Sequence, residues 1–111
     1  MNINEFVKDF LDKSNAYDTK NYLDKWNENA VLDDPSVGKV FKGHLGIQNY
    51  FESYFIRYKT QTRLVKLEIS TNDEAHLEVE FTGEFPEGII GGTFDLSFKN
   101  GKIDKAKADL I

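Results

Sequence analysis

The spacing of the apolar residues changes once along this chain, near Thr62, and this change limits the folds that the chain can adopt. Before Thr62, apolar residues recur at intervals of three and four, which is typical of α-helices with one buried face. After it, apolar and polar residues alternate, which is typical of β-strands with one buried face. This order predicts an α+β domain in which three N-terminal helices cover one face of a curled antiparallel sheet of about four to six strands.

Two helices are predicted in the first 30 residues. The first begins after Asn2, a good N-terminal capping residue, and its buried stripe consists of Ile3, Phe6, Val7, Phe10 and Leu11. The second is shorter and begins after Asp18, which is expected to cap it. Its predicted buried side consists of Tyr22, Leu23 and Trp26.

A short strand and a third helix are predicted next. The stretch AVLDDP, residues 30–35, is predicted to be a strand because Pro35 and Gly38 stop a helix. The third helix begins after Gly43 and carries the clearest stripe in the chain, formed by Ile47, Tyr50, Phe51, Tyr54, Phe55 and Tyr58.

The second half of the chain is predicted to form strands, with Asn100-Gly101 as a hairpin turn before the last of them. Their inward faces are expected to carry Val65, Leu67 and Ile69, then Ala75, Leu77, Val79 and Phe81, then Phe94, Leu96 and Phe98, and finally Ala106, Ala108 and Leu110. The glycines of EGIIGG, at positions 88, 91 and 92, are predicted to bend the sheet, with Gly92 leaving room beside a pocket.

Composition and charge narrow the class of protein. The 111 residues predict one domain, residues 1–111, and the net charge is −5 with both signs scattered along the chain. Without a basic stripe, nucleic acids and anionic membranes are not expected partners. There is no cysteine, no membrane-length apolar run and no signal-peptide pattern, so we expect a cytoplasmic protein without disulfides.

The order and spacing of several motifs resemble the nuclear transport factor 2-like (NTF2-like) superfamily, near its SnoaL-like branch. The resemblance covers essentially the whole chain. It is carried by Phe6 and Phe10, by Asp18, Tyr22 and Trp26, by AVLDDP, by the pattern KG-x-x-GI-x-x-YF from Lys42 to Phe51, and by NGKI before the last strand.

The resemblance implies a cystatin-like cone, in which three helices pack on one face of a curled antiparallel or mixed sheet around a deep apolar pocket. Such proteins include ketosteroid isomerases, dehydratases, epoxide hydrolases, polyketide cyclases and non-catalytic binding or assembly domains, so the fold alone does not give the function. Many relatives are homodimers, and we expect one here through the outer sheet face.

Asp34 is the first candidate site residue. Strand alternation predicts that Asp34 points inward with Leu32 while Asp33 points to solvent. The resemblance matches Asp34 to the proton-shuttling carboxylate of the ketosteroid isomerases, and a carboxylate at the rim of an apolar cavity could serve as a general base. The alternative is that an Asp before Pro only hydrogen-bonds to local N–H groups in a turn.

The oxyanion-binding donors of a steroid isomerase are not matched. The corresponding positions are Phe10 and, because alternation places Asp95 outward, Phe94. Tyr54 is the predicted substitute donor, with Tyr50 as a second possibility, and the alternative for both is core packing. No metal site or cofactor is predicted, since His76, Glu78 and Glu80 are spaced along a strand too widely for one ion.

These residues together define a predicted ligand pocket and three possible functions. The pocket is expected to be lined by Phe6, Phe10, Trp26, Leu32, Asp34, Phe51, Tyr54, Leu77, Val79, Phe81, Phe94, Leu96, Phe98, Ala108 and Leu110. The leading hypothesis is a domain that binds a small, largely apolar ligand. The alternatives are an isomerase, lyase or cyclase that uses Asp34 as general base, and a non-catalytic homodimeric assembly module.

Overall fold

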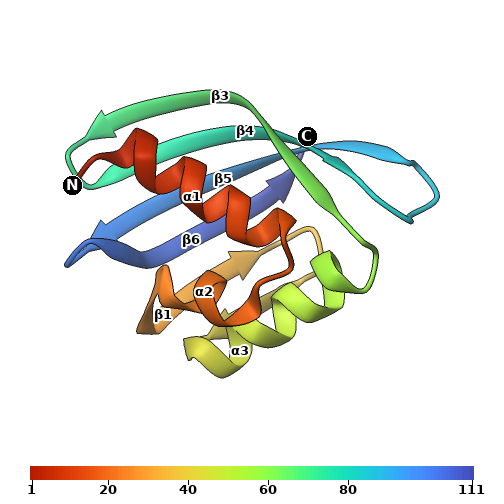
Figure 1. The fold of residues 1–111 in the computed structure, drawn as a ribbon, viewed down its shortest axis with the longest axis horizontal. Helices are drawn as coiled ribbons and strands as arrows, with labels where there is room; N and C mark the ends of the chain where they lie inside the picture. Colours follow the sequence, from red (N-terminus) through yellow and green to blue (C-terminus); the bar gives the residue numbers. More distant parts are fainter.

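The α+β prediction is confirmed by a computed structural model, which describes residues 1–111 (Figure 1). The helices are α1 (Ile3–Asn15), α2 (Thr19–Asp24) and α3 (Gly43–Phe51), the last extended by one π-helical turn, η1 (Glu52–Ile56). The strands are β1 (Trp26–Asp34), β2 (Lys39–Lys42), β3 (Gln61–Thr71), β4 (Glu74–Thr82), β5 (Ile89–Lys99) and β6 (Lys102–Leu110). Helix α1 crosses one face of the sheet (Figure 1).

Both predicted helix caps are confirmed, but the second helix is shorter than expected. The Asn2 side chain accepts a hydrogen bond from the Glu5 backbone N–H (3.1 Å), and Asp18 does the same for Asn21 (3.3 Å). The prediction that Trp26 belongs to the second helix is wrong, because α2 ends at Asp24 and Trp26 is the first residue of β1. Six residues form too few turns to extend the stripe to this position.

The sheet is mixed rather than antiparallel throughout, and this corrects the prediction from the alternating pattern. Its strand order is β2-β1-β6-β5-β4-β3. Strand β1 pairs in parallel with β6, with Leu32 opposite Ala106, while all other pairs are antiparallel. Alternation shows which residues of a strand share a face, but it does not show which strands become neighbours. Strand β2 was not predicted.

The predicted inward faces of β4 and β5 are confirmed, whereas β3 departs from the prediction. A bulge between Leu64 and Lys66 inserts Val65 as an extra residue opposite β4, so alternation is interrupted there. Val65 is consequently 47% exposed. Leu67 still packs against the core, and Ile69, which lies on the same face opposite Ala75, is 45% exposed near the end of this edge strand. No helix of the structure has the length and apolarity needed to cross a membrane.

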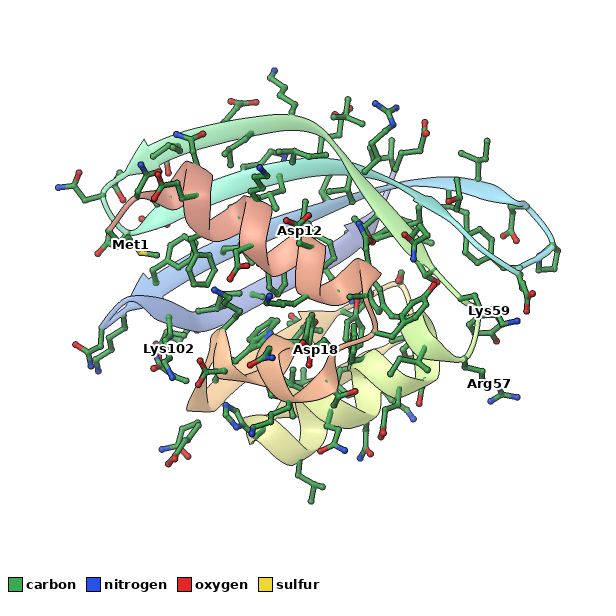
Figure 2. The ribbon with its side chains drawn as sticks, viewed as in Figure 1. Met1, Asp12, Asp18, Arg57, Lys59 and Lys102 are labelled. Atoms are coloured by element: carbon green, nitrogen blue, oxygen red, sulfur yellow. The ribbon has the colours of Figure 1, made fainter.

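Aromatic rings fill much of the space between the helices and the sheet. Tyr22 of α2 stacks on Phe51 of α3 with ring centroids 3.9 Å apart, and Phe10 of α1 packs against Tyr22 at 5.3 Å. Charged side chains such as Arg57, Lys59 and Lys102 extend outward from the surface (Figure 2). The core therefore depends on rings from all three helices packed over one sheet face.

The absence of a side chain at Gly92 makes space for the ring of Phe81 on the neighbouring strand. A Cβ atom at Gly92 would lie 2.4 Å from Cε2 of Phe81 and 3.2 Å from the carbonyl oxygen of Asp109. The Phe81 ring meets Phe55 and Phe94 edge to face, at 5.8 and 6.0 Å. Gly92 is thus required by a close contact rather than by an unusual backbone conformation.

We expect Gly92→Ala to lower the free energy of unfolding by about 1–3 kcal/mol relative to Gly91→Ala, because the new methyl group displaces the Phe81 ring. Gly91 is the matched control, since its Cβ would meet only the Ile111 side chain, at 3.3 Å, which is 76% exposed. Both substitutions restrict the unfolded chain equally. Urea unfolding measures the difference, and equal stabilities would contradict this reading of Gly92.

Candidate functional site

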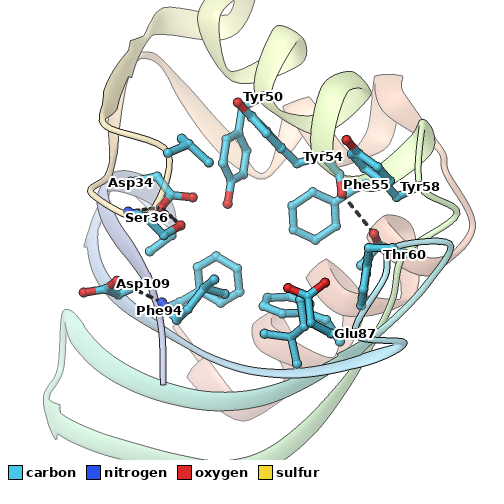
Figure 3. Close-up of a pocket in the computed structure, with 16 residues that line it drawn as sticks. Asp34, Ser36, Tyr50, Tyr54, Phe55, Tyr58, Thr60, Glu87, Phe94 and Asp109 are labelled. Carbon is cyan, nitrogen blue, oxygen red and sulfur yellow. Dashed lines mark hydrogen bonds between the residues drawn. The ribbon is translucent and has the colours of Figure 1, made fainter.

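A cavity of about 210 Å³ opens where α3, η1, the end of β1, the end of β6 and the β4–β5 loop meet (Figure 3). This volume is smaller than the roughly 300–1,000 Å³ of pockets for drug-sized ligands, so it favours a small ligand. Its lining residues are Asp34, Ser36, Val37, Tyr50, Tyr54, Phe55, Tyr58, Thr60, Phe81, Phe85, Glu87, Ile90, Phe94, Ala108, Asp109 and Leu110.

The structure brings some of the predicted pocket residues together around this cavity and leaves others in the core. Those that line the cavity are Asp34, Tyr54, Phe81, Phe94, Ala108 and Leu110. Those that do not line it are Phe6, Phe10, Trp26, Leu32, Phe51, Leu77, Val79, Leu96 and Phe98, which pack between the helices and the sheet. The two groups share one sheet face, but the helices fill the space over the second group.

Asp34 lies in the cavity wall and also forms the local turn. It is the last residue of β1, it is 5% exposed, and it lines the cavity, whereas Asp33 is exposed. Its Oδ1 accepts hydrogen bonds from the Ser36 backbone N–H (3.0 Å) and from the Ser36 hydroxyl (2.5 Å). This is the local turn that an Asp before Pro was expected to form. Both bonds end on Oδ1, which leaves Oδ2 outside the turn.

Tyr50 is a second hydroxyl-bearing residue beside Asp34, after Ser36. Burial, and then the neighbouring Asp34 carboxylate, raise the pKa of Tyr50 well above its ordinary value of 10.0. The hydroxyl therefore stays protonated and can donate a hydrogen bond at the cavity wall. Tyr54, the residue predicted from sequence, lies one turn further along, with its ring centroid 5.5 Å from that of Tyr50.

The π-helical turn shapes the other side of the cavity. The Arg57 N–H bonds to the Glu52 carbonyl (3.0 Å), and the Thr60 N–H bonds to the Phe55 carbonyl (2.8 Å). The Thr60 hydroxyl also donates to the Tyr54 carbonyl at 2.9 Å. Single π-helical turns are frequent at functional sites. The sequence stripe indicated the ring positions here but not the change in helix type.

The β4–β5 loop supplies wall residues that sequence reasoning missed. Phe85 and Glu87 line the cavity from this loop, and Glu87 lies opposite Asp34 (Figure 3). The Glu84 N–H donates to the Tyr58 carbonyl (2.6 Å), which holds the loop against the end of the helix. The sequence of this loop contains turn residues but no pattern that predicts which part of the helix the loop contacts.

The predicted orientation of Phe94 and Asp95 is confirmed. Phe94 is 5% exposed and lines the cavity, while Asp95 lies outside and bonds to His76. Phe10 is buried in the core and does not reach the cavity. Both positions that the resemblance matches to oxyanion-binding donors therefore hold phenylalanine rings, which cannot donate hydrogen bonds.

The fold is shared with solved structures of low sequence identity. No family model and no curated protein matches the sequence. A candidate polyketide cyclase from Sinorhizobium meliloti is 18% identical, with a TM-score of 0.84 over 94% of this chain and 93% of that one. SalBIII, an epoxide hydrolase/cyclase-like enzyme with a role in pyran ring formation in salinomycin, is 20% identical, with a TM-score of 0.84 over 97% and 89%.

A third similar structure is an NTF2-like protein of unknown function from Cytophaga hutchinsonii. It is 15% identical, with a TM-score of 0.80 over 100% of this chain and 91% of that one. The chain therefore has the NTF2-like fold, an α+β cone whose sheet is not closed, and the predicted resemblance is confirmed at the level of the fold. At these identities the likeness does not extend to the reaction or the ligand.

We expect Tyr50→Phe to flatten the decline of stability between about pH 9 and 11. In the wild type, a tyrosine in the unfolded chain ionises near pH 10 while buried Tyr50 stays protonated, because its pKa is raised. Its contribution is complete below pH 10 and decreases above it by up to about 1.4 kcal/mol per pH unit. The variant lacks this loss. Urea unfolding at several pH values measures the free energy of unfolding of both proteins. If the two stability curves ran parallel between about pH 9 and 11, Tyr50 would not be the buried tyrosine responsible for the loss.

Proposed function

We propose that this protein binds a small, largely apolar molecule in the cavity, with Asp34 and Tyr50 as the polar groups that orient it. The observation that carries the proposal is a buried carboxylate in a wall of mostly hydrophobic residues, many of them aromatic. Apolar pockets with a few placed polar groups are typical of small-molecule sites. An open cavity is also what a binding domain requires, whereas a pure assembly module needs none.

The turn around Asp34 supports a role in orientation. Ser36 holds Oδ1 through its N–H and its hydroxyl, so the carboxylate is fixed before any ligand arrives. A fixed group loses less conformational freedom on binding than a flexible surface side chain. Asp34 can accept a hydrogen bond from a ligand hydroxyl or amide, and the Tyr50 hydroxyl can donate one to a ligand carbonyl.

We expect uncharged apolar compounds that carry one carbonyl, amide or hydroxyl group to raise the melting temperature of the wild type. The rise is expected to be smaller in Asp34→Asn, because Asn keeps the size but replaces one acceptor oxygen with a donor. Asp33→Asn is the matched control, because Asp33 is next to Asp34 in the chain but its carboxylate is exposed and lies outside the cavity. Equal rises in all three proteins for every active compound would remove Asp34 from the site.

Catalysis is the second candidate, favoured by the position of the Tyr50 hydroxyl beside the Asp34 carboxylate. In such an isomerase, lyase or cyclase, Asp34 would take a proton next to a carbonyl while a tyrosine hydroxyl polarises the carbonyl oxygen. Tyr54, the donor that the sequence predicts, lies beside Tyr50 and has the same proposed role. The ring at Phe94 leaves fewer donors than a steroid isomerase requires.

If the protein has this activity, bound ketones should exchange their α-protons with D₂O faster than in buffer. Exchange should fall by about 10²-fold or more in Asp34→Asn, which lacks the base, and should persist in Asp33→Asn. Proton NMR follows the loss of the α-proton signal. If ketones bind but their α-protons exchange no faster than in buffer, the binding function stands and the catalytic function is excluded.

A further inference from the structure

The charged residues that line the cavity all carry the same sign. They are Asp34, Glu87 and Asp109, and no lysine, arginine or histidine lines the wall. Seven of the other lining residues are aromatic: Tyr50, Tyr54, Phe55, Tyr58, Phe81, Phe85 and Phe94. Aromatic rings present a negative face, so the rings and the carboxylates attract the same kind of ligand.

Asp34 has no positive partner within the protein. It is 5% exposed, and no lysine or arginine forms an ion pair with it. Lys39 lies directly opposite Asp34 in the β1–β2 ladder, but it is exposed and outside the cavity wall. A buried carboxylate normally has a counter-charge, because removing an unpaired charge from water is costly. The cavity is the side from which a counter-charge could reach it.

The other two carboxylates differ in orientation. Glu87 extends from the β4–β5 loop toward the cavity, on the side opposite Asp34 (Figure 3). Asp109 accepts a hydrogen bond from the Leu110 N–H at 2.9 Å, and its carboxylate points away from the middle of the cavity. Asp34 and Glu87 are therefore the two negative groups that a bound molecule would meet.

We propose that the ligand is a small organic cation, an amine or quaternary ammonium group with apolar substituents. This inference rests on the proposed binding function and specifies its ligand class. The cationic centre would lie between Asp34 and the aromatic rings, with Glu87 at the opposite side, and the substituents would fill the apolar remainder. An anionic ligand would meet two carboxylates and no positive side chain, so the same wall excludes carboxylates and phosphates.

The test uses three probes of matched size that differ in charge: phenyltrimethylammonium, neutral tert-butylbenzene and phenylacetate. We expect the cation to bind the wild type about tenfold or more tightly than the neutral probe, and phenylacetate not to bind. Dissociation constants come from chemical-shift titrations of the labelled protein. The shifts should map to residues of the cavity wall, because the net charge of −5 also attracts cations weakly to the surface.

Matched variants decide whether the cavity carboxylates are responsible. Asp34→Asn and Glu87→Gln should each reduce the preference for the cation, whereas Asp33→Asn and Glu84→Gln remove an equal charge nearby and should leave it unchanged. Neither control residue lines the cavity. Glu87 is exposed, so its variant tests the proposal even if Asp34→Asn fails to fold.

The outcomes separate this inference from the proposed function. A neutral probe that binds in the cavity as tightly as the cation would overturn the inference and leave the binding function intact. A cation preference that both cavity variants retain would overturn it as well, since the attraction would then come from the surface. Failure of every probe, and of the uncharged compounds described above, to bind would overturn the binding function itself.

Discussion

The parallel pairing between β1 and β6 is the contact on which the candidate site depends. It joins a strand near the start of the chain to the last strand, with Leu32 opposite Ala106 and Asp33 opposite Lys107. This register continues toward Asp34 and Ala108, which both line the cavity. Without this pairing, β1 would pair only with β2, and Asp34 would lie away from the cavity residues of β6. Long-range pairing of this kind is set by the whole fold and not by any local segment.

Local physical rules explain why much of the fold was predictable from the sequence. The helix caps at Asn2 and Asp18 rest on side-chain hydrogen bonds to a residue three positions further along, and such bonds involve neighbours in the chain. The inward position of Asp34 and Phe94 follows from strand alternation, which is also local. Where a rule needs only a few consecutive residues, the sequence contains all the information that the rule uses.

The failures arise where segments distant in sequence meet. Val65 became exposed because a bulge formed against β4, and the π-helical turn at the end of α3 was not predicted, although Tyr54 lines the cavity as expected. Phe85 and Glu87 line the cavity because the β4–β5 loop is hydrogen-bonded to Tyr58, just after the π-helical turn. The predicted pocket was also too deep, since aromatic rings of α1 and α2 fill the space over the inner part of the sheet.

The structural and the functional interpretations of Asp34 are not alternatives, because they involve different oxygen atoms. Ser36 engages Oδ1 and thereby fixes the side chain, while Oδ2 takes no part in that turn. In the proposed site, the turn would thus supply the positioning that a binding site otherwise needs from a second layer of residues. The same arrangement explains why a carboxylate is suited to this position: it can form the turn with one oxygen and still present a negative charge to the cavity. A serine or threonine at position 34 could do the first but not the second.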